Sequence, residues 1–227
     1  MPKTRRGFLT LAGAALMVAG LPAIAPVAAK EELQETEISP AEDLMREHGI
    51  LRRLLLIYDE VLRRMDKNTE TPAEVISGSA GIVRRFIENY HEKLEEEEVF
   101  PRFNKAGRLT GLVKVLYGQH QAGRRLTDEI LRTSSASALG IGQPRHELVE
   151  SLERFIRMYR PHAAREDTVL FPSFRTILTA KEYDQLGEKF EDKEMELFGK
   201  GGFEKIVEEV AELERKLGVY DLAQFTP

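Results

Sequence analysis

The chain has 227 residues, a formal net charge of −5 and no cysteine. Without cysteine it can form no disulfide, thiolate metal site or iron–sulfur cluster, so any metal must be bound through nitrogen and oxygen. The acidic balance gives it no electrostatic reason to bind nucleic acid, and the length is enough for one domain with a sizeable core.

The first 29 residues are typical of an export signal. A twin arginine, Arg5-Arg6, precedes an uncharged apolar stretch that runs from Leu9 to Ala29 and ends in small residues. This arrangement resembles a twin-arginine signal that is cleaved after Ala29. Cleavage after Ala25 is an alternative, although the proline that follows disfavours it. An uncleaved membrane anchor is the other interpretation, because the stretch is nearly long enough to span a bilayer.

Cleavage would remove three cations and no acid, which moves the formal net charge from −5 to −8. The resemblance implies a periplasmic or otherwise extracytoplasmic protein without stable membrane insertion once the signal is removed. This pathway moves folded proteins, so it suits a chain whose metal is inserted before export. Residues 30–38 then form a linker.

Four helices are predicted between residues 39 and 172. Ser39 to Glu42 and Thr71 to Glu74 each read as a capping box with proline at the first helical position. The first helix repeats apolar residues or histidine in alternating steps of four and three, so His48 lies in its buried stripe. The second carries His91 and Glu95 on a broad inward face. It should stop near Phe100-Pro101, because proline cannot continue it.

The third and fourth helices repeat this pattern. His120 lies in the apolar stripe of the third helix, which the serines and glycines from Ser134 to Gly142 end in a loop. His162 and Glu166 lie in the stripe of the fourth, which runs to Phe171-Pro172. A carboxylate in a buried stripe costs free energy unless it is paired or metal-bound, so Glu166 needs a partner.

Residues 173–227 are predicted to add two helices without histidine. Thr179 to Glu182 reads as a third capping box, and the glycines from Gly199 to Gly202 separate the two helices. We expect them to pack on the bundle or to form a homodimer contact. No strand pattern occurs, so the predicted fold class is all-α: an antiparallel up-down four-helix bundle over residues 39–172 with two additional C-terminal helices.

One motif is written twice. Histidine, glutamate, phenylalanine and proline recur at identical offsets, from His91 to Pro101 and from His162 to Pro172. His48 and His120, each followed by arginine at the fourth position, precede these motifs by 43 and 42 residues. Histidine and carboxylate at i and i+4 share one helix face, so the doubled unit points these groups at one interior point.

Six side chains are the predicted metal ligands: His48, His91, Glu95, His120, His162 and Glu166. Imidazole suits iron, zinc, copper or nickel, and carboxylates can bridge two cations and reduce their mutual repulsion. With histidines as terminal ligands and glutamates as bridges, each metal receives two nitrogens and two oxygens and stays open to a further ligand. Two redox-capable ions so held can bind a diatomic molecule or peroxide. Zinc would fill the same ligands without redox chemistry.

Two acidic neighbours leave alternatives open. Asp167 competes with Glu166, although the repeat favours Glu166. The acids around Glu95 are most simply a solvated acidic edge, with Glu96 as a reserve ligand only: Glu92, Glu96, Glu97 and Glu98. His146 is predicted to face solvent, because the 16 residues to the next histidine place it about 160° away around a helix.

Arg52 and Arg124 follow His48 and His120 by four residues. A guanidinium cannot ligate a cation, so each would pair with a carboxylate behind the ligands, anchor an anion, or form an ordinary ion pair. Four tyrosines lie on or beside the inward stripes: Tyr58, Tyr90, Tyr117 and Tyr159. One of them could donate a hydrogen bond to bound oxygen, whereas the default for the set is core packing with a satisfied hydroxyl.

Residues 40–172 resemble the hemerythrin family, specifically its histidine-histidine-glutamate cation-binding branch. The resemblance rests on the ligand positions above with Phe100-Pro101 and Phe171-Pro172. It implies an antiparallel four-helix bundle around a non-haem di-iron centre. Oxygen-carrying hemerythrins place a second histidine four residues after that of the third helix. Arg124 holds this position here, which argues against reversible oxygen carriage.

This branch implies reactivity toward dioxygen, peroxide or nitric oxide, or sensing of iron. We therefore expect two iron ions, with an oxo or hydroxo bridge as one form, in an exported protein that binds and reacts with such a small ligand. No catalytic residue is assigned beyond the metal ligands. The alternatives are a module that senses or buffers iron or oxygen without turnover, and a metal-free helical scaffold.

Overall fold

The computed structural model describes residues 38–135 and 142–227, and in those residues all regular structure is helical. The expected all-α class is confirmed. The predicted signal and the linker up to residue 37 lie outside the described residues. Among the helices described, none combines the length and the hydropathy needed to cross a membrane.

The elements in chain order include π-helical segments (η1, η2, η4) and 3₁₀ turns (η5, η6). They are α1 (Pro40–Asp66), α2 (Ala73–Ile82), η1 (Val83–His91), α3 (Glu92–Leu94), η2 (Glu95–Val99), α4 (Phe100–Lys105), α5 (Thr110–Thr133), α6 (Gln143–Arg165), η4 (Glu166–Leu170), α7 (Phe171–Phe174), η5 (Arg175–Ile177), α8 (Ala180–Phe198), α9 (Gly202–Leu217) and η6 (Leu222–Phe225).

α1 begins where the sequence predicts. The Ser39 hydroxyl accepts a hydrogen bond from the backbone N–H of Glu42 at 3.3 Å, and Pro40 occupies the first turn, where its missing N–H costs nothing. The stripe that carries His48 is buried against the rest of the bundle, from Leu44 to Met65. α1 therefore presents His48 to the core.

The second predicted capping box does not form. α2 begins at Ala73 with Pro72 as its N-cap residue, and no side chain caps its first turn. Thr71 lies one position too early, and its hydroxyl donates to the carbonyl of Thr69 instead. The third predicted box is present, because the Thr179 and Glu182 side chains each accept from the other's backbone N–H.

The prediction that the second helix stops near Phe100-Pro101 is wrong. The chain remains helical to Lys105, because a wide π turn, in which the Glu95 carbonyl accepts from the Phe100 N–H, precedes the proline. Proline then falls in the first turn of α4, where it needs no N–H partner. The fourth helix likewise continues past Pro172, after the π turn Glu166–Leu170. Each predicted bridging glutamate opens one of these turns.

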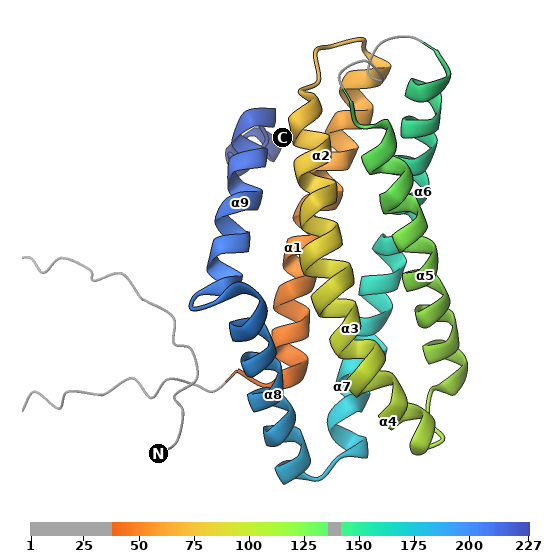
Figure 1. The fold of residues 1–227 in the computed structure, drawn as a ribbon, viewed down its shortest axis with the longest axis vertical. Helices are drawn as coiled ribbons and strands as arrows, with labels where there is room; N and C mark the ends of the chain where they lie inside the picture. Colours follow the sequence, from red (N-terminus) through yellow and green to blue (C-terminus); the bar gives the residue numbers. More distant parts are fainter. Residues whose placement is uncertain (1–37, 136–141) are drawn as a thin grey trace, which may run out of the picture.

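The long helices lie side by side in a bundle (Figure 1). α5 packs along α6, α1 packs along α6, and α2 lies against α1 and α5. α8 and α9 cover α1, and α9 also covers α2, on the side away from α5. The predicted ligands lie on α1, on the continuous helical run from α2 to α4, on α5 and on the run from α6 to α7, and they converge inside the bundle.

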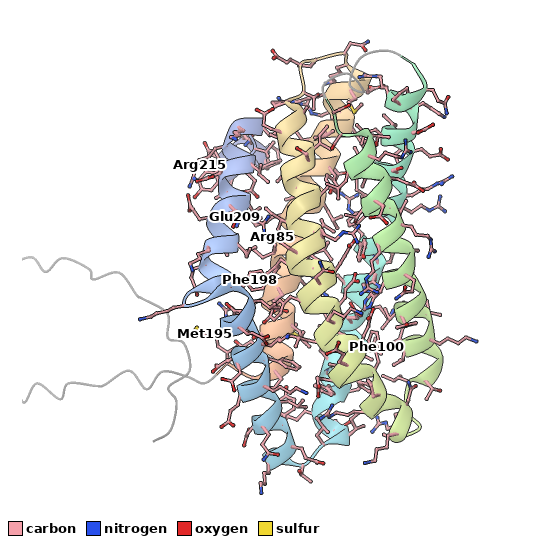
Figure 2. The ribbon with its side chains drawn as sticks, viewed as in Figure 1. Arg85, Phe100, Met195, Phe198, Glu209 and Arg215 are labelled. Carbon is pink, nitrogen blue, oxygen red and sulfur yellow. The ribbon has the colours of Figure 1, made fainter. Side chains whose placement is uncertain are left out.

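Polar contacts join the two C-terminal helices to each other and to the bundle. Glu194 in α8 accepts from the backbone N–H of Phe203 at 2.6 Å, which caps α9 across the glycine break. Arg85 on η1 forms an ion pair with Glu209 on α9 (Figure 2). The apolar side of α9 is buried at Ile206, Val210, Leu213 and Leu217.

Candidate metal centre

Four imidazoles meet in the middle of the bundle, in two pairs. His48 of α1 lies beside His91 of η1, with ring centroids 4.7 Å apart. His120 of α5 lies beside His162 of α6, with centroids 5.1 Å apart. None of the four exceeds 3% exposure. Each long helical segment thus contributes one histidine.

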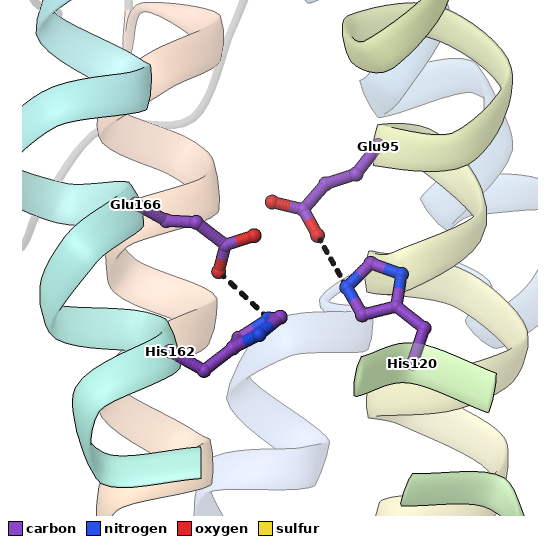
Figure 3. A group of neighbouring side chains, drawn as sticks. All are labelled: Glu95, His120, His162 and Glu166. Atoms are coloured by element: carbon purple, nitrogen blue, oxygen red, sulfur yellow. Dashed lines mark ion pairs between the residues drawn. The ribbon is translucent and has the colours of Figure 1, made fainter. Parts of the chain in front are cut away.

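Two carboxylates connect the pairs. The Oε2 atom of Glu166 lies 3.0 Å from His162 Nε2 and 3.3 Å from His48 Nε2. The Oε2 atom of Glu95 lies 3.3 Å from His120 Nε2 and 3.9 Å from His91 Nε2. Each carboxylate therefore reaches one histidine of each pair. Figure 3 shows the two carboxylates directed toward each other above His120 and His162.

Donor atoms of these residues fall into two groups that share Glu95. Within each group, one donor atom per residue lies within 4.8 Å of every other: His48, His91 and Glu95 form one group, and Glu95, His120, His162 and Glu166 form the other. The six predicted ligands are thus brought together in the described part of the chain. His146, by contrast, is exposed on α6, as predicted.

The carboxylates repel each other without a cation. Both are fully buried. Burial, and then the negative charge of Glu166, raises the pKa of Glu95 well above its ordinary value. Burial alone would raise the pKa of Glu166, but His162 and His48 outweigh it and bring the pKa below its ordinary value. Burial lowers the pKa of His91, and it lowers that of His120 to about 4, so both rings stay neutral at pH 7.

Several donor atoms of the centre have no hydrogen-bond partner among the described residues. They are both carboxylate oxygens of Glu95 and of Glu166, together with the Nε2 atoms of His48 and His120. Leaving such atoms buried and unpaired is costly, whereas coordination to a cation would satisfy them. Because the donors are imidazole nitrogen and carboxylate oxygen, they fit iron.

A different acceptor holds the other nitrogen of each ring. The distances from Nδ1 are 2.7 Å for His48 to Asp167, 2.7 Å for His91 to Glu47, 3.2 Å for His120 to Glu96 and 2.9 Å for His162 to the Gln119 side-chain oxygen. An ionised carboxylate or an amide oxygen only accepts, so opposite such a group Nδ1 carries the proton and the Nε2 lone pair faces the centre. This is the tautomer that a metal requires.

The two acidic neighbours left open by the sequence take this supporting position. Asp167 contacts His48 Nδ1, whereas Glu166 contacts Nε2 atoms. Glu96, the reserve ligand, contacts His120 Nδ1. Each is the residue directly after a predicted bridging glutamate, so one turn of helix supplies both a predicted ligand and a contact to the Nδ1 atom of another.

Both arginines pair with these supporting carboxylates. Arg52 forms an ion pair with Asp167, and Arg124 lies 2.7 Å from Glu96 and 2.9 Å from Glu92. Of the roles considered from the sequence, the structure shows pairing with a carboxylate behind the ligands. The guanidinium groups hold these carboxylates in the orientation that the imidazoles need.

Aromatic rings enclose the centre. Phe171 stacks on His48 and Phe100 stacks on His120, each with centroids 5.4 Å apart. The Tyr159 hydroxyl donates to the buried carboxyl of Glu92 at 2.6 Å, and its ring edge meets His162. Tyr58 and Tyr90 are also buried. Core packing, the default expectation for the four tyrosines, is wrong for Tyr117, because this residue lies at the edge of the α5 stripe and is 49% exposed.

Sequence reasoning missed Glu47 and Gln119, and the interpretation of Glu92 as part of a solvated edge is wrong, because Glu92 is buried. Glu47 and Gln119 directly precede His48 and His120 and so occupy equivalent places in the repeat. That equivalence is the signal that could have found them. Burial raises the pKa of Glu47, and that of Glu92, to about 8.

A known family matches the part of the chain that holds the centre. The model of the hemerythrin HHE cation-binding domain matches residues 39–174. Proteins of Mycobacterium bovis and of two strains of Mycobacterium tuberculosis are 48% identical over 194 residues, which covers 86% of this chain and 76% of each relative. Each of these relatives is described as an uncharacterized protein. No solved structure gives a significant match.

Proposed function

Because this chain belongs to the hemerythrin HHE cation-binding family, we propose that it is a di-iron protein that binds and reacts with dioxygen, nitric oxide or peroxide. Its bundle is of the antiparallel up-down four-helix type. His48 and His91 would hold one ion, His120 and His162 would hold the other, and Glu95 and Glu166 would contribute carboxylates to both. The observation that carries the proposal is that each buried, unpaired carboxylate reaches a histidine of each pair, at 3.0–3.9 Å.

The protein's own residues orient the ligands and exclude water. The four Nδ1 contacts fix the rings, and Phe100 and Phe171 cover two of them. Two nitrogens and two carboxylate oxygens for each ion would leave coordination positions open. Iron in such a site supplies electrons and open positions for a small ligand.

We also propose that the protein works outside the cytoplasm. The support is the twin arginine followed by the uncharged apolar stretch from Leu9 to Ala29. Cell fractionation of the tagged full chain tests this, with Arg5 and Arg6 both replaced by Lys as the control. Retention of the unsubstituted chain in the cytoplasm would contradict the proposal.

Metal analysis and rapid mixing test the di-iron function. The protein purified from its native compartment should contain about two irons per chain. After anaerobic reduction, mixing with nitric oxide or peroxide should give a rapid change in the visible spectrum. His146→Ala, which alters an exposed histidine, should behave as the unsubstituted protein, and Glu95→Gln should lose iron. An iron-loaded protein that shows no optical change would rule out the reaction.

A second candidate is a sensing or buffering module without turnover. Burial and the charge of Glu166 raise the pKa of Glu95, so an ionised Glu95 costs stability until a cation binds, and such a core can couple metal occupancy to folding. A large change in melting temperature on iron removal, with binding but no consumption of nitric oxide or peroxide, would favour this second function.

A further inference from the structure

The Nδ1 contacts differ between the two histidine pairs. His48 and His91 both donate to carboxylates, those of Asp167 and Glu47, each at 2.7 Å. In the other pair, one ring donates instead to the neutral amide of Gln119, at 2.9 Å. With a cation bound beyond the ring, which favours the ionised form of Glu47, the ring contacts of the first pair are more negative.

The other Nδ1 contact of the second pair has the same chemistry as its counterpart in the first pair. His120 donates to Glu96 at 3.2 Å, and an arginine pairs with that carboxylate, as an arginine does behind His48. The contact that differs in charge is Glu47 against Gln119. They are equivalent in the repeat, since each directly precedes the histidine of its own helix.

Cations balance the remaining acid near the second pair. Glu92 lies close to Glu96 and His120. Arg124 contacts both carboxylates, and the Lys93 ammonium lies 2.7 Å from Glu96. Two cationic side chains thus face two acidic ones. On the first pair, Glu47 contacts His91 inside the core at 1% exposure.

A carboxylate behind an imidazole strengthens it as a ligand. It attracts the Nδ1 proton, which increases electron density at Nε2, and its charge attracts the cation beyond the ring. A neutral amide fixes the same tautomer but supplies less of both effects. Replacing such a supporting group changes metal affinity by about tenfold to a hundredfold.

We propose that Glu47 makes the two metal positions unequal, so that the His48/His91 position binds its cation more tightly and fills first. The inference rests on the proposed two-metal function. Glu47 acts through His91 and is a positioning residue. Gln119, its counterpart, leaves the His120/His162 position weaker, as the one that gains and loses its ion more readily.

Repulsion between two neighbouring cations would separate the binding steps even at equal positions. The observation of two binding steps is therefore not sufficient evidence for unequal positions, and the test must change the affinity of each step separately. Glu47→Gln and Gln119→Glu are matched, since they make the same chemical exchange in opposite directions at equivalent places.

Metal-free full-length protein would be titrated anaerobically with ferrous iron against a chromophoric chelator, and in parallel with cobalt(II). Glu47→Gln should weaken the first step by about tenfold to a hundredfold and leave the second nearly unchanged. Gln119→Glu should strengthen the second step by a similar factor. Disturbed packing weakens binding and does not strengthen it, so this gain separates a positioning role from a structural one.

A variant that carries both Glu47→Gln and Gln119→Glu identifies which metal position binds more tightly. In the unsubstituted protein, His162→Ala should remove the weak step. In the Glu47→Gln, Gln119→Glu background it should remove the tight step. Circular dichroism of each metal-free variant verifies the fold.

Two results would overturn the inference: Glu47→Gln acting on the weak step, or Gln119→Glu leaving both steps unchanged. If the unsubstituted protein takes up neither iron nor cobalt, it is the proposed function that fails.

Discussion

At the scale of single residues, each imidazole of the centre is held at Nδ1, and those of His48 and His120 are left unpaired at Nε2. The acceptors at Nδ1 fix the tautomer, and these two Nε2 atoms face the carboxylates of Glu166 and Glu95. Such rings need no rearrangement to receive a cation. The arrangement also depends on small residues that leave room for larger ones.

Gly123 is such a residue. A Cβ at this position of α5 would lie 1.9 Å from the hydroxyl oxygen of Tyr159, so Gly123→Ala should destabilise the protein by roughly 1–3 kcal/mol. Gly118→Ala on the same helix is the control, because its Cβ meets nothing within 4 Å. It should stabilise by about 0.5–1 kcal/mol through helix propensity. Urea unfolding of both measures this, and equal effects would contradict the packing argument.

Glu92 gives the metal-free protein a pH dependence. Burial raises the pKa of Glu92 to about 8 from an ordinary 4.5. The folded state therefore binds the proton more tightly, and the stability that it contributes is complete below pH 4.5 and is lost as the pH rises through 8. From pH 6.5 to 8 the chelated protein should lose at most about 2 kcal/mol through this group.

Glu92→Gln should reduce this loss, because the amide does not titrate. Urea unfolding in EDTA at three pH values between 6.5 and 8 provides the measurement, with Glu153→Gln on the exposed side of α6 as the control. Identical slopes in Glu92→Gln and the unsubstituted protein would exclude Glu92 as the cause.

At the scale of elements, the π turns organise the centre. Glu95, a proposed bridging ligand, opens one turn, the next residue contacts the Nδ1 atom of His120, and Phe100 after the turn stacks on the same ring. The turn that starts at Glu166 does the same for His48 through Asp167 and Phe171. The extra residue in a π turn shifts these side chains around the helix, and such turns are frequent at functional sites.

Helix caps provide an element-scale prediction. Thr179→Ala should cost about 1 kcal/mol, because its hydroxyl accepts from the backbone N–H of Glu182 at the start of α8. Thr71→Ala should change stability by less than about 0.5 kcal/mol, because the Thr71 side chain caps no helix. Thermal melts of the two variants compare them directly, and an equal loss in both would refute the assignment of the caps.

At the scale of the whole molecule, one centre ties together four helical segments that are far apart in the chain. Burial and the negative charge of Glu166 raise the pKa of Glu95, so an ionised Glu95 destabilises the fold when no cation is bound. A cation that binds only the folded state adds its binding free energy to stability. Metal occupancy should therefore dominate the melting temperature.

Chelation should lower the melting temperature by about 15–30 °C. Each of two ions at a thousandfold excess over its Kd adds about 4 kcal/mol, and 1 kcal/mol corresponds to about 2–4 °C in a domain of this size. Calorimetry with and without EDTA, followed by addition of iron, measures the change. His146→Ala should keep the full shift, because that side chain is exposed. A melting temperature insensitive to chelator would contradict the linkage.

The sequence by itself determined the helical class, the six converging donors and the outward position of His146. These follow from helical periodicity and from a duplicated unit, both of which are properties of local spacing. The same spacing identified the family to which the chain belongs. It also led to an error, because the proline rule ended two helices that continue after a π turn.

Only the tertiary structure decided which acceptor stands behind each ring. Glu47 contacts His91, which lies 44 residues later in the chain, and Gln119 contacts His162, which lies 43 residues later. Each contact joins two different helices. Such contacts depend on how the helices rotate and slide against each other, which packing of the whole core sets. For the same reason, Tyr117 faces outward although it lies three residues before a buried histidine.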